Sequence, residues 1–341
     1  MTIYLQVDTY LSMELNTEIK ISTDSIFNRI SKVVPEIEWK VHAPLIHKIN
    51  KLKKEKNAVI LAHNYQTPEI YHGVADFAAD SLALAEEASK TSADIIVMCG
   101  VHFMAETAKL MNPLKKVLLP DMSAGCSLSS SITGKDVRLL KEKYPGVPVV
   151  SYVNTSADVK AETDICCTSA NAVKIVESLG VKKVIFLPDD YLAKYVAANT
   201  NVEIISWSGT CIVHEQFTAK EITEIREQNP GIVVIAHPEC PPAVINASDF
   251  AGSTTGMSEY VKKNQPKKVM MVTECSMSDN VQVENPKVEF IKPCNLCPYM
   301  KKITLPKILN CLENESNEII IPNHLIKKAR SSVEKMTSVG R

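Results

Sequence analysis

Short runs of apolar residues alternate with helical stretches along the chain. The runs are apolar nearly from end to end, which indicates strands covered on both faces, as in parallel sheets flanked by helices. Repeated alternation of such strands with helices predicts an α/β fold. The predicted strands are AVILAH (58–63), DIIVMCG (94–100), KVLLP (116–120), VPVVSYV (147–153), KVIFLP (183–188), VEIISW (202–207), GIVVIAH (231–237), KVMMVT (268–273) and VEFIKP (288–293).

One pattern recurs along the chain at intervals of 85 and 86 residues. It begins with a cysteine, followed by a predicted helix that ends at Pro-Gly, and then by an apolar strand with polar residues at its carboxyl end. CSLSSSITGKDVRLLKEKYPGVPVVSYVN begins at Cys126, and CIVHEQFTAKEITEIREQNPGIVVIAHPE begins at Cys211. A third, shorter copy, CPYMKKITLPKILNCLENESNEIIIP, begins at Cys297. Repetition at a fixed period predicts three related α/β domains.

The length of the chain agrees with this division, because 341 residues exceed what one compact core usually holds. Residues 1–37 have no counterpart in the repeat and are interpreted as an N-terminal extension. We expect the three domains at residues 38–144, 145–229 and 230–341. The C-terminal helices, which include HLIKKARSSVEKM, are expected to pack back onto an earlier domain.

Polar side chains gather at the predicted carboxyl ends of the strands, where parallel α/β sheets bind ligands. A single Ser or Thr before a helix is usually an N-cap worth about 1 kcal/mol, and a single His or Tyr is as often a packing residue. Recurrence at three equivalent strand ends favours a binding site instead. Helix N-termini attract anions, so we expect a substrate with carboxylates or a phosphate. The residues are His63-Asn64-Tyr65, Asp80-Ser81, Tyr152-Val153-Asn154, Thr168-Ser169, His237-Pro238-Glu239-Cys240 and Ser253-Thr254-Thr255-Gly256.

The chain has ten cysteines. In a cytosolic protein thiols stay reduced, so this number indicates metal or redox chemistry and not structural disulfides. Some cysteines nevertheless behave as small apolar residues in a core. We interpret four in this way: Cys99, Cys166, Cys167 and Cys311.

The repeat brings one cysteine from each copy toward a common axis, where three thiolates would form a face of metal ligands. A structural zinc site needs a fourth ligand and usually uses two CxxC motifs. The chain has a single CxxC motif, at residues 294–297. A 4Fe–4S cluster ordinarily takes four cysteines, so three would leave one iron open as a Lewis acid. Spacing alone leaves both iron and zinc possible.

Charge and hydropathy exclude several classes of partner. The formal net charge of -1 gives no general attraction to nucleic acid or to an anionic membrane. No apolar run approaches the roughly 20 residues that a membrane span needs. The N-terminal residues lack the basic start and apolar core of a secretory signal. We therefore expect a cytoplasmic protein that binds neither nucleic acid nor membrane.

Nine motifs occur in register from about residue 40 to the C-terminus. They are HNYQ (63–66), DSLALA (80–85), CGVHFMAETAKLMNP (99–113), YVNT (152–155), TSANAV (168–173), GTCIVHEQF (209–217), AHPEC (236–240), GSTTGM (252–257) and CNLCPYMKKITL (294–305). Together they resemble the quinolinate synthase A family. Nine matches in one order are far more specific than any single motif.

The resemblance implies both a fold and an activity. The fold is three αβα sandwich domains around a pseudo-threefold axis, with a 4Fe–4S cluster at the centre. The enzyme condenses iminoaspartate (iminosuccinate) with dihydroxyacetone phosphate, loses phosphate and two waters, and forms quinolinate. This reaction is an early step of de novo NAD synthesis. The usual source of iminoaspartate is L-aspartate oxidase or aspartate dehydrogenase.

The resemblance also implies which cysteines hold the cluster. Cys126, Cys211 and Cys297 match the ligands of the family, and the last is the cysteine directly before Pro298-Tyr299-Met300. Cys294 is then not a ligand. It either has no role or forms a redox-sensitive pair with Cys297.

Other positions match groups that bind the substrate or take part in the chemistry. The residues expected to act in catalysis are Tyr65, Glu239, His63 and His237. The residues expected to bind substrate are His63, Ser81, Tyr152, Asn154, Ser169, His237, Glu239 and Thr254. His214, three residues after Cys211, is either a neighbour of the metal ligands or a residue of the helix surface.

Two other classes of protein agree less well with the pattern. A radical or redox iron–sulfur protein would carry a CxxxCxxC triad or paired CxxC motifs, and the sequence has neither. A zinc-stabilised scaffold without catalytic activity has no need for His-Asn-Tyr, Tyr-x-Asn and His-x-Glu sets at strand ends. The iron and zinc content of anaerobically purified protein distinguishes the zinc scaffold from an iron–sulfur enzyme.

Overall fold

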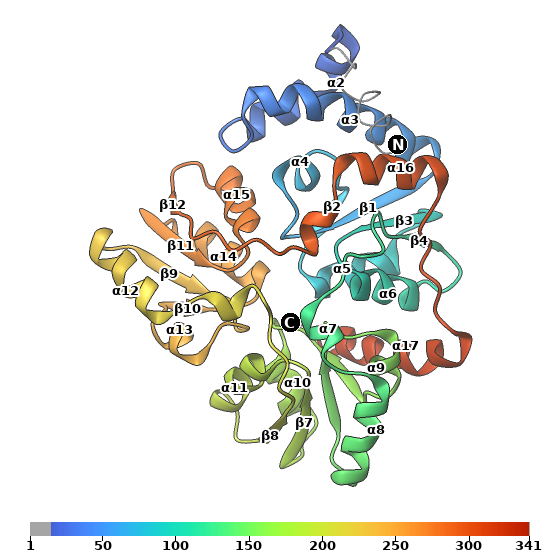
Figure 1. The fold of residues 1–341 in the computed structure, drawn as a ribbon, viewed down its shortest axis with the longest axis vertical. Helices are drawn as coiled ribbons and strands as arrows, with labels where there is room; N and C mark the ends of the chain where they lie inside the picture. Colours follow the sequence, from blue (N-terminus) through green and yellow to red (C-terminus); the bar gives the residue numbers. More distant parts are fainter. Residues whose placement is uncertain (1–14, 341) are drawn as a thin grey trace, which may run out of the picture.

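Three four-stranded parallel sheets form the framework of the protein. The computed structural model describes residues 15–340, and Figure 1 shows the sheets grouped around a common centre. The first sheet has the order β2 (Phe77–Ala79), β1 (Ala58–His63), β3 (Ile95–Cys99), β4 (Lys116–Leu118). The second is β6 (Ile165–Cys167), β5 (Val149–Tyr152), β7 (Lys183–Leu187), β8 (Glu203–Ser206). The third is β10 (Phe250–Ala251), β9 (Val233–Ala236), β11 (Lys268–Val272), β12 (Glu289–Ile291).

Helices flank all three sheets, which confirms the expected α/β fold of three αβα sandwiches. Before and around the first sheet lie α2 (Thr17–Ile30), α3 (Glu36–Glu55), α4 (Pro68–Tyr71), α5 (Ser81–Lys90) and α6 (His102–Met111). The second repeat contains α7 (Ser127–Ser130), α8 (Gly134–Lys143), α9 (Ala157–Ala161), α10 (Ala172–Ser178) and α11 (Asp190–Ala198). The third contains η1 (His214–Gln216), α12 (Ala219–Gln228), α13 (Pro242–Asn246), α14 (Thr254–Asn264) and α15 (Cys275–Glu284). The C-terminal segment contains η2 (Met300–Lys302), α16 (Leu305–Asn314) and α17 (Asn323–Val339).

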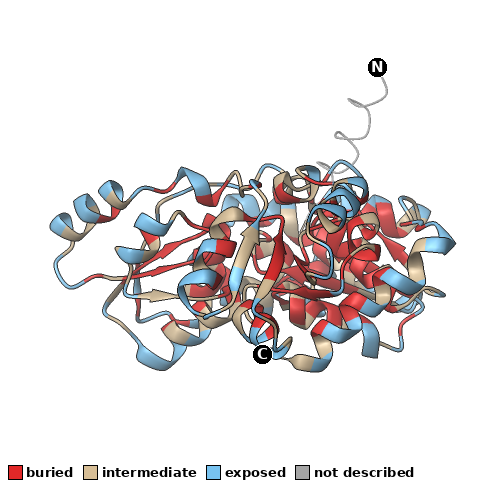
Figure 2. Ribbon diagram, turned by 90° about the horizontal axis from the view of Figure 1, so that it is seen from below, coloured by how far each residue is buried: buried red, intermediate tan, exposed pale blue. Residues whose placement is uncertain are grey.

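The inner strands are buried on both faces, as their unbroken apolar runs predict. All five residues of β3 are buried, and Figure 2 shows the buried residues concentrated in the strands. All nine predicted strands are present. The prediction missed β2, β6 and β10, the equivalent edge strands of the three sheets. Each has only two or three residues, too few to show a hydrophobic pattern.

The chain passes from one sheet to the next in the same way in each repeat. Each of the three aligned cysteines lies in the segment that leaves β4, β8 or β12. The longer helix that follows then covers the next sheet. Val137 of α8 packs with Val149 of β5, and Ile222 of α12 packs with Val234 of β9. In the third repeat α16 packs against α3 and β3, which returns the chain to the first sheet.

Both ends of the described chain pack on the first two sheets. Helix α17 contacts α9, β6 and α6. Helix α2 packs on α3, where the rings of Phe27 and Trp39 stack with centroids 5.2 Å apart. The expected extension covers residues 1–37, of which 1–14 lie outside the described residues. Within residues 15–340, no helix is both long enough and apolar enough to cross a membrane.

Candidate active site

One cavity with about 700 Å³ of empty space lies where the carboxyl ends of the three sheets meet. Every residue that the sequence predicted for catalysis, substrate binding or metal binding lines it. The twelve are His63, Tyr65, Ser81, Cys126, Tyr152, Asn154, Ser169, Cys211, His237, Glu239, Thr254 and Cys297.

Two histidines at the strand ends have the same local geometry. The backbone N–H of Tyr65 donates to Nδ1 of His63 at 3.2 Å, and that of Glu239 donates to Nδ1 of His237 at 3.3 Å. When Nδ1 accepts, the proton of the neutral ring is on Nε2. Burial lowers the pKa of His63 to about 4 and that of His237 to about 3. Both imidazoles are therefore neutral near pH 7.

The side chain of Glu239 lies between Tyr152 and His214 in the cavity. The Tyr152 hydroxyl donates to Oε1 at 2.5 Å, and Nδ1 of His214 lies 2.8 Å from Oε2. Burial opposes ionisation, but His214, His237 and the hydrogen bond from Tyr152 outweigh it, so the pKa of Glu239 is below its usual range. Glu239 is therefore a carboxylate.

The polar residues of different repeats also contact each other. Oγ of Ser169 lies 3.1 Å from Nε2 of His237, which links the second repeat to the third. Nδ2 of Asn64 donates to Oγ1 of Thr254 at 2.9 Å, which links the first repeat to the third. Oδ1 of Asn154 is buried and has no hydrogen-bond partner among residues 15–340. Because buried amide oxygens are normally paired, this one is suited to a bound ligand.

Two helices begin at the cavity wall. Ser81 is the first residue of α5 and Thr254 is the first residue of α14. Oδ1 of Asp80 caps α5 and accepts the N–H of Ala83, and Oγ of Ser253 caps α14. The free N–H groups and the helix dipole at such ends favour a carboxylate or phosphate group.

The three aligned cysteines face the same cavity. Burial raises the pKa of Cys126 to about 12, and burial also raises the pKa of Cys211 and Cys297. Such thiols lose their protons when a metal binds them. Among residues 15–340, the group whose ligand atoms lie within 4.8 Å of one another, and which could hold one metal ion, is Cys211, His214 and Glu239; the three aligned cysteines do not form such a group. A cluster, whose irons take separate thiolates, fits this wider face of ligands.

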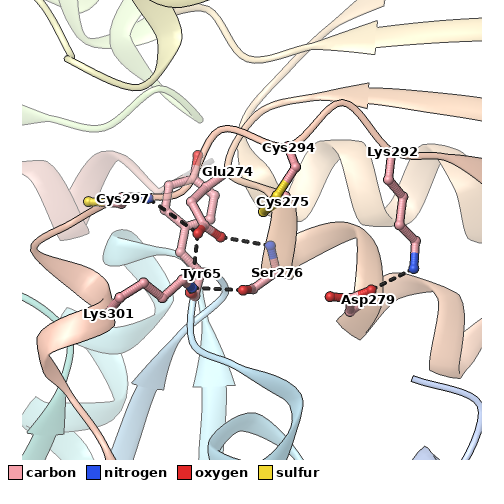
Figure 3. Close-up of a disulfide and its surroundings, with 9 residues drawn as sticks. All are labelled: Tyr65, Glu274, Cys275, Ser276, Asp279, Lys292, Cys294, Cys297 and Lys301. Carbon is pink, nitrogen blue, oxygen red and sulfur yellow. Dashed lines mark hydrogen bonds and ion pairs between the residues drawn. A yellow bond between two sulfur atoms is a disulfide. The ribbon is translucent and has the colours of Figure 1, made fainter. Parts of the chain in front are cut away.

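Cys294 lies against Cys275 and not against Cys297. The structure joins Cys275 and Cys294 in a disulfide with a Cα–Cα distance of 4.9 Å (Figure 3). The hypothesis of a Cys294–Cys297 pair is therefore wrong in this structure, and so is the expectation of no structural disulfide at this position. The four cysteines predicted to be small core residues are all buried, as expected.

Two side chains that support the site, Thr273 and Lys301, were not predicted from the sequence, and the place of a third, His214, was left open. His214 is buried, with Nδ1 3.1 Å from Sγ of Cys211, so it is a neighbour of the aligned cysteine and not a surface residue. Thr273, directly after β11, is also buried. Its place at a strand end was the available signal. Lys301 donates from Nζ to the Tyr65 carbonyl at 2.7 Å and pairs with Glu274 at 2.9 Å, as seen in Figure 3.

Known proteins share this sequence over most of its length. A model of the family described as "Quinolinate synthetase A protein" matches residues 47–338. A quinolinate synthase of Sinorhizobium fredii is 59% identical over 93% of this chain and 88% of its own length. Quinolinate synthase 1 of Mesorhizobium japonicum is 59% identical over 93% of this chain and 98% of its own length. A quinolinate synthase of Xylella fastidiosa is 60% identical over 86% of this chain and 87% of its own length. The chain therefore belongs to the quinolinate synthetase A family, a family of enzymes.

Proposed function

We propose that this enzyme condenses iminoaspartate with dihydroxyacetone phosphate and releases quinolinate, phosphate and two waters. The observation that carries the proposal is that twelve residues from all three repeats line one cavity. The names of the relatives support the same product. We place the reaction in de novo NAD synthesis in the cytoplasm, downstream of an L-aspartate oxidase or an aspartate dehydrogenase.

Four neutral side chains are placed to bind the anionic substrates. Ser81 and Thr254 stand at the N-termini of α5 and α14, where their hydroxyls and the helix ends favour carboxylates. Asn154 and Ser169 come from the second repeat and face the same cavity. Iminoaspartate has two carboxylates, and the triose has one phosphate. A cavity with hydrogen-bond donors on several walls suits such a pair.

The remaining polar groups are suited to moving protons. His63 and His237 are neutral with the proton on Nε2, so each can donate a hydrogen bond to a substrate oxygen or nitrogen during enolisation and imine formation. Glu239 is ionised and accepts hydrogen bonds from Tyr152 and His214, which hold its carboxylate in place. Burial and the Glu239 charge raise the pKa of Tyr65, so the phenol keeps its proton near pH 7 and can serve as an acid toward the triose phosphate.

The cysteines complete the site. Cys126, Cys211 and Cys297 would hold a 4Fe–4S cluster, one iron of which would have no protein ligand and would polarise a substrate oxygen or nitrogen as a Lewis acid. The protein supplies the binding, the orientation and the proton-transfer groups around it.

An anaerobic assay for quinolinate tests the proposal. Wild type should form quinolinate from iminoaspartate and dihydroxyacetone phosphate, whereas Cys126→Ser, Cys211→Ser and Cys297→Ser should lose this activity. Cys294→Ser is the matched control, because Cys294 bonds to Cys275 and does not line the cavity. Wild type without product, or an active triple variant of the aligned cysteines, would refute the proposal.

A further inference from the structure

A row of hydrogen bonds connects Tyr65 to Glu239 through two buried side chains. Oη of Tyr65 lies 2.6 Å from Oγ1 of Thr273, which lies 3.0 Å from Nε2 of His214. Nδ1 of His214 lies 2.8 Å from Oε2 of Glu239. Thr273 is 0% exposed and His214 is 1% exposed, so water does not compete for these bonds. Thr273 was not predicted to act in the site, and the place of His214 was left open.

A carboxylate only accepts, so Nδ1–H of His214 donates to Glu239. Oγ1 of Thr273 lies within hydrogen-bond distance of both the Tyr65 hydroxyl and Nε2 of His214. The Tyr65 hydroxyl lies farther from Nε2 of His214, at 3.3 Å, so its shorter contact is with Thr273. Thr273 thus bonds both neighbours at once, and each bond fixes one orientation.

The backbone repeat does not require a hydroxyl at this position. The residue 85 positions before Thr273, at the end of β7, is Pro188, which has no side-chain donor or acceptor. β7 ends at Leu187 and β11 ends at Val272, so each strand ends directly before the compared residue. The hydroxyl of Thr273 is therefore a property of the third repeat, where Tyr65 and His214 meet it.

We propose that Thr273 is a positioning residue that holds the Tyr65 phenol and the His214 ring in the orientations required for the reaction. Its hydroxyl lies 2.6 Å from the phenol oxygen and fixes the position of that oxygen at the cavity wall. The same hydroxyl contacts Nε2 of the His214 ring, which keeps Nδ1 toward Glu239. This inference rests on the proposed function, because it assigns a role within that reaction.

Two substitutions of Thr273 separate the hydroxyl from the shape of the side chain. Thr273→Val keeps the branched shape and removes the hydroxyl, and Thr273→Ser keeps the hydroxyl. The matched control is Thr163→Val, which removes a buried hydroxyl that bonds only the Val159 carbonyl of α9. The measurements are kcat and KM under anaerobic conditions, the visible absorption of the purified protein, and the affinity for quinolinate by titration calorimetry.

Thr273→Val should lower kcat about tenfold and change KM and quinolinate affinity less than about twofold, since an orienting hydrogen bond acts on the reacting state. Thr273→Ser should recover most of the lost kcat, and Thr163→Val should match wild type. All variants should keep the absorption of wild type. A fully active Thr273→Val beside an active wild type would overturn the inference and leave the proposed function intact. So would a Thr273→Ser as impaired as Thr273→Val. If wild type forms no quinolinate, the proposed function fails and the inference fails with it.

Discussion

Two buried carboxyl groups occupy equivalent places in the second and third repeats. Asp189 follows β7 and Glu274 follows β11, 85 positions apart. Each caps the next helix, and each is 0% exposed. Each also forms a backbone bridge to the residue that lies two positions before an aligned cysteine, Gly209 for Asp189 and Asn295 for Glu274. The repeat thus reproduces the backbone around the two cysteines.

The partners of the two carboxyl groups differ. Glu274 pairs with Lys301 and accepts the N–H of Cys297 at 3.4 Å (Figure 3). Asp189 makes no ion pair within the described part of the chain, and its Oδ2 has no hydrogen-bond partner there. Burial raises the pKa of both groups, and Lys301 opposes that rise only at Glu274. The repeat therefore determines where the two carboxyl groups lie. Side chains that differ between the repeats, such as Lys301, determine whether each carboxyl group has an ion-pair partner.

The largest effect should come from removing the cation of the third repeat. Lys301→Met leaves Glu274 buried without its ion-pair partner and removes the bond to the Tyr65 carbonyl. Loss of one partner of a buried pair costs about 3–5 kcal/mol, so urea unfolding should show a loss of that order. Lys302→Met is the control, because Lys302 makes only an exposed bond to Ser123 and should cost less than about 0.5 kcal/mol.

A second substitution identifies the source of that loss. Adding Glu274→Gln to Lys301→Met removes the unpaired charge and should restore part of the stability, as a double-mutant cycle measures. Equal losses for Lys301→Met and Lys302→Met would show that the pair does not distinguish the two repeats.

The disulfide is a further difference between the repeats, with an intermediate expected effect. At the repeat offsets, Cys275 and Cys294 correspond to Asp190 and Ser208, which cannot form such a bond. The cysteines are 19 positions apart, and closing a loop of this size stabilises by about 3 kcal/mol in the chain-entropy model. Oxidised wild type should therefore lose about that much stability on adding dithiothreitol.

Cys294→Ser provides the matched control for the disulfide. Its unfolding free energy should be the same with and without reductant, and close to that of reduced wild type. A wild type that is insensitive to dithiothreitol would contradict a stabilising bond between Cys275 and Cys294.

The effect of Asp189→Asn, which keeps the cap and removes the ionisable group, should depend on pH. Burial and the nearby Glu239 charge raise the pKa of Asp189 in the folded state above its usual value. The raised pKa contributes stability that is fully present below pH 4. As the pH rises from 4 toward the folded pKa, the free energy of unfolding of wild type should fall relative to that of Asp189→Asn, by at most about 1.4 kcal/mol per pH unit. Unfolding from pH 4 to 8 should show wild type falling relative to Asp189→Asn. Parallel curves would contradict the raised pKa.

The sequence predicted the sheets and the lining of the cavity well, for a physical reason. Apolar strands and polar strand ends are local patterns, and the repeat at 85 and 86 positions showed which ones are equivalent. The missed features depend on contacts between distant side chains. Tyr65 and Thr273 are 208 positions apart, and the partner of Cys294 is Cys275 and not the adjacent motif cysteine. Such pairs arise only when three repeats fold together.

Iron content is the most direct test of the central claim, that each repeat contributes one cysteine to a single 4Fe–4S cluster. Wild type, Cys297→Ser and Cys294→Ser should be purified without oxygen and analysed for iron and zinc. The account predicts about four irons per chain and absorption near ~400 nm in wild type and in Cys294→Ser, and loss of iron in Cys297→Ser. Stoichiometric zinc without iron in wild type would contradict it, as would a Cys297→Ser that keeps its iron while Cys294→Ser loses it.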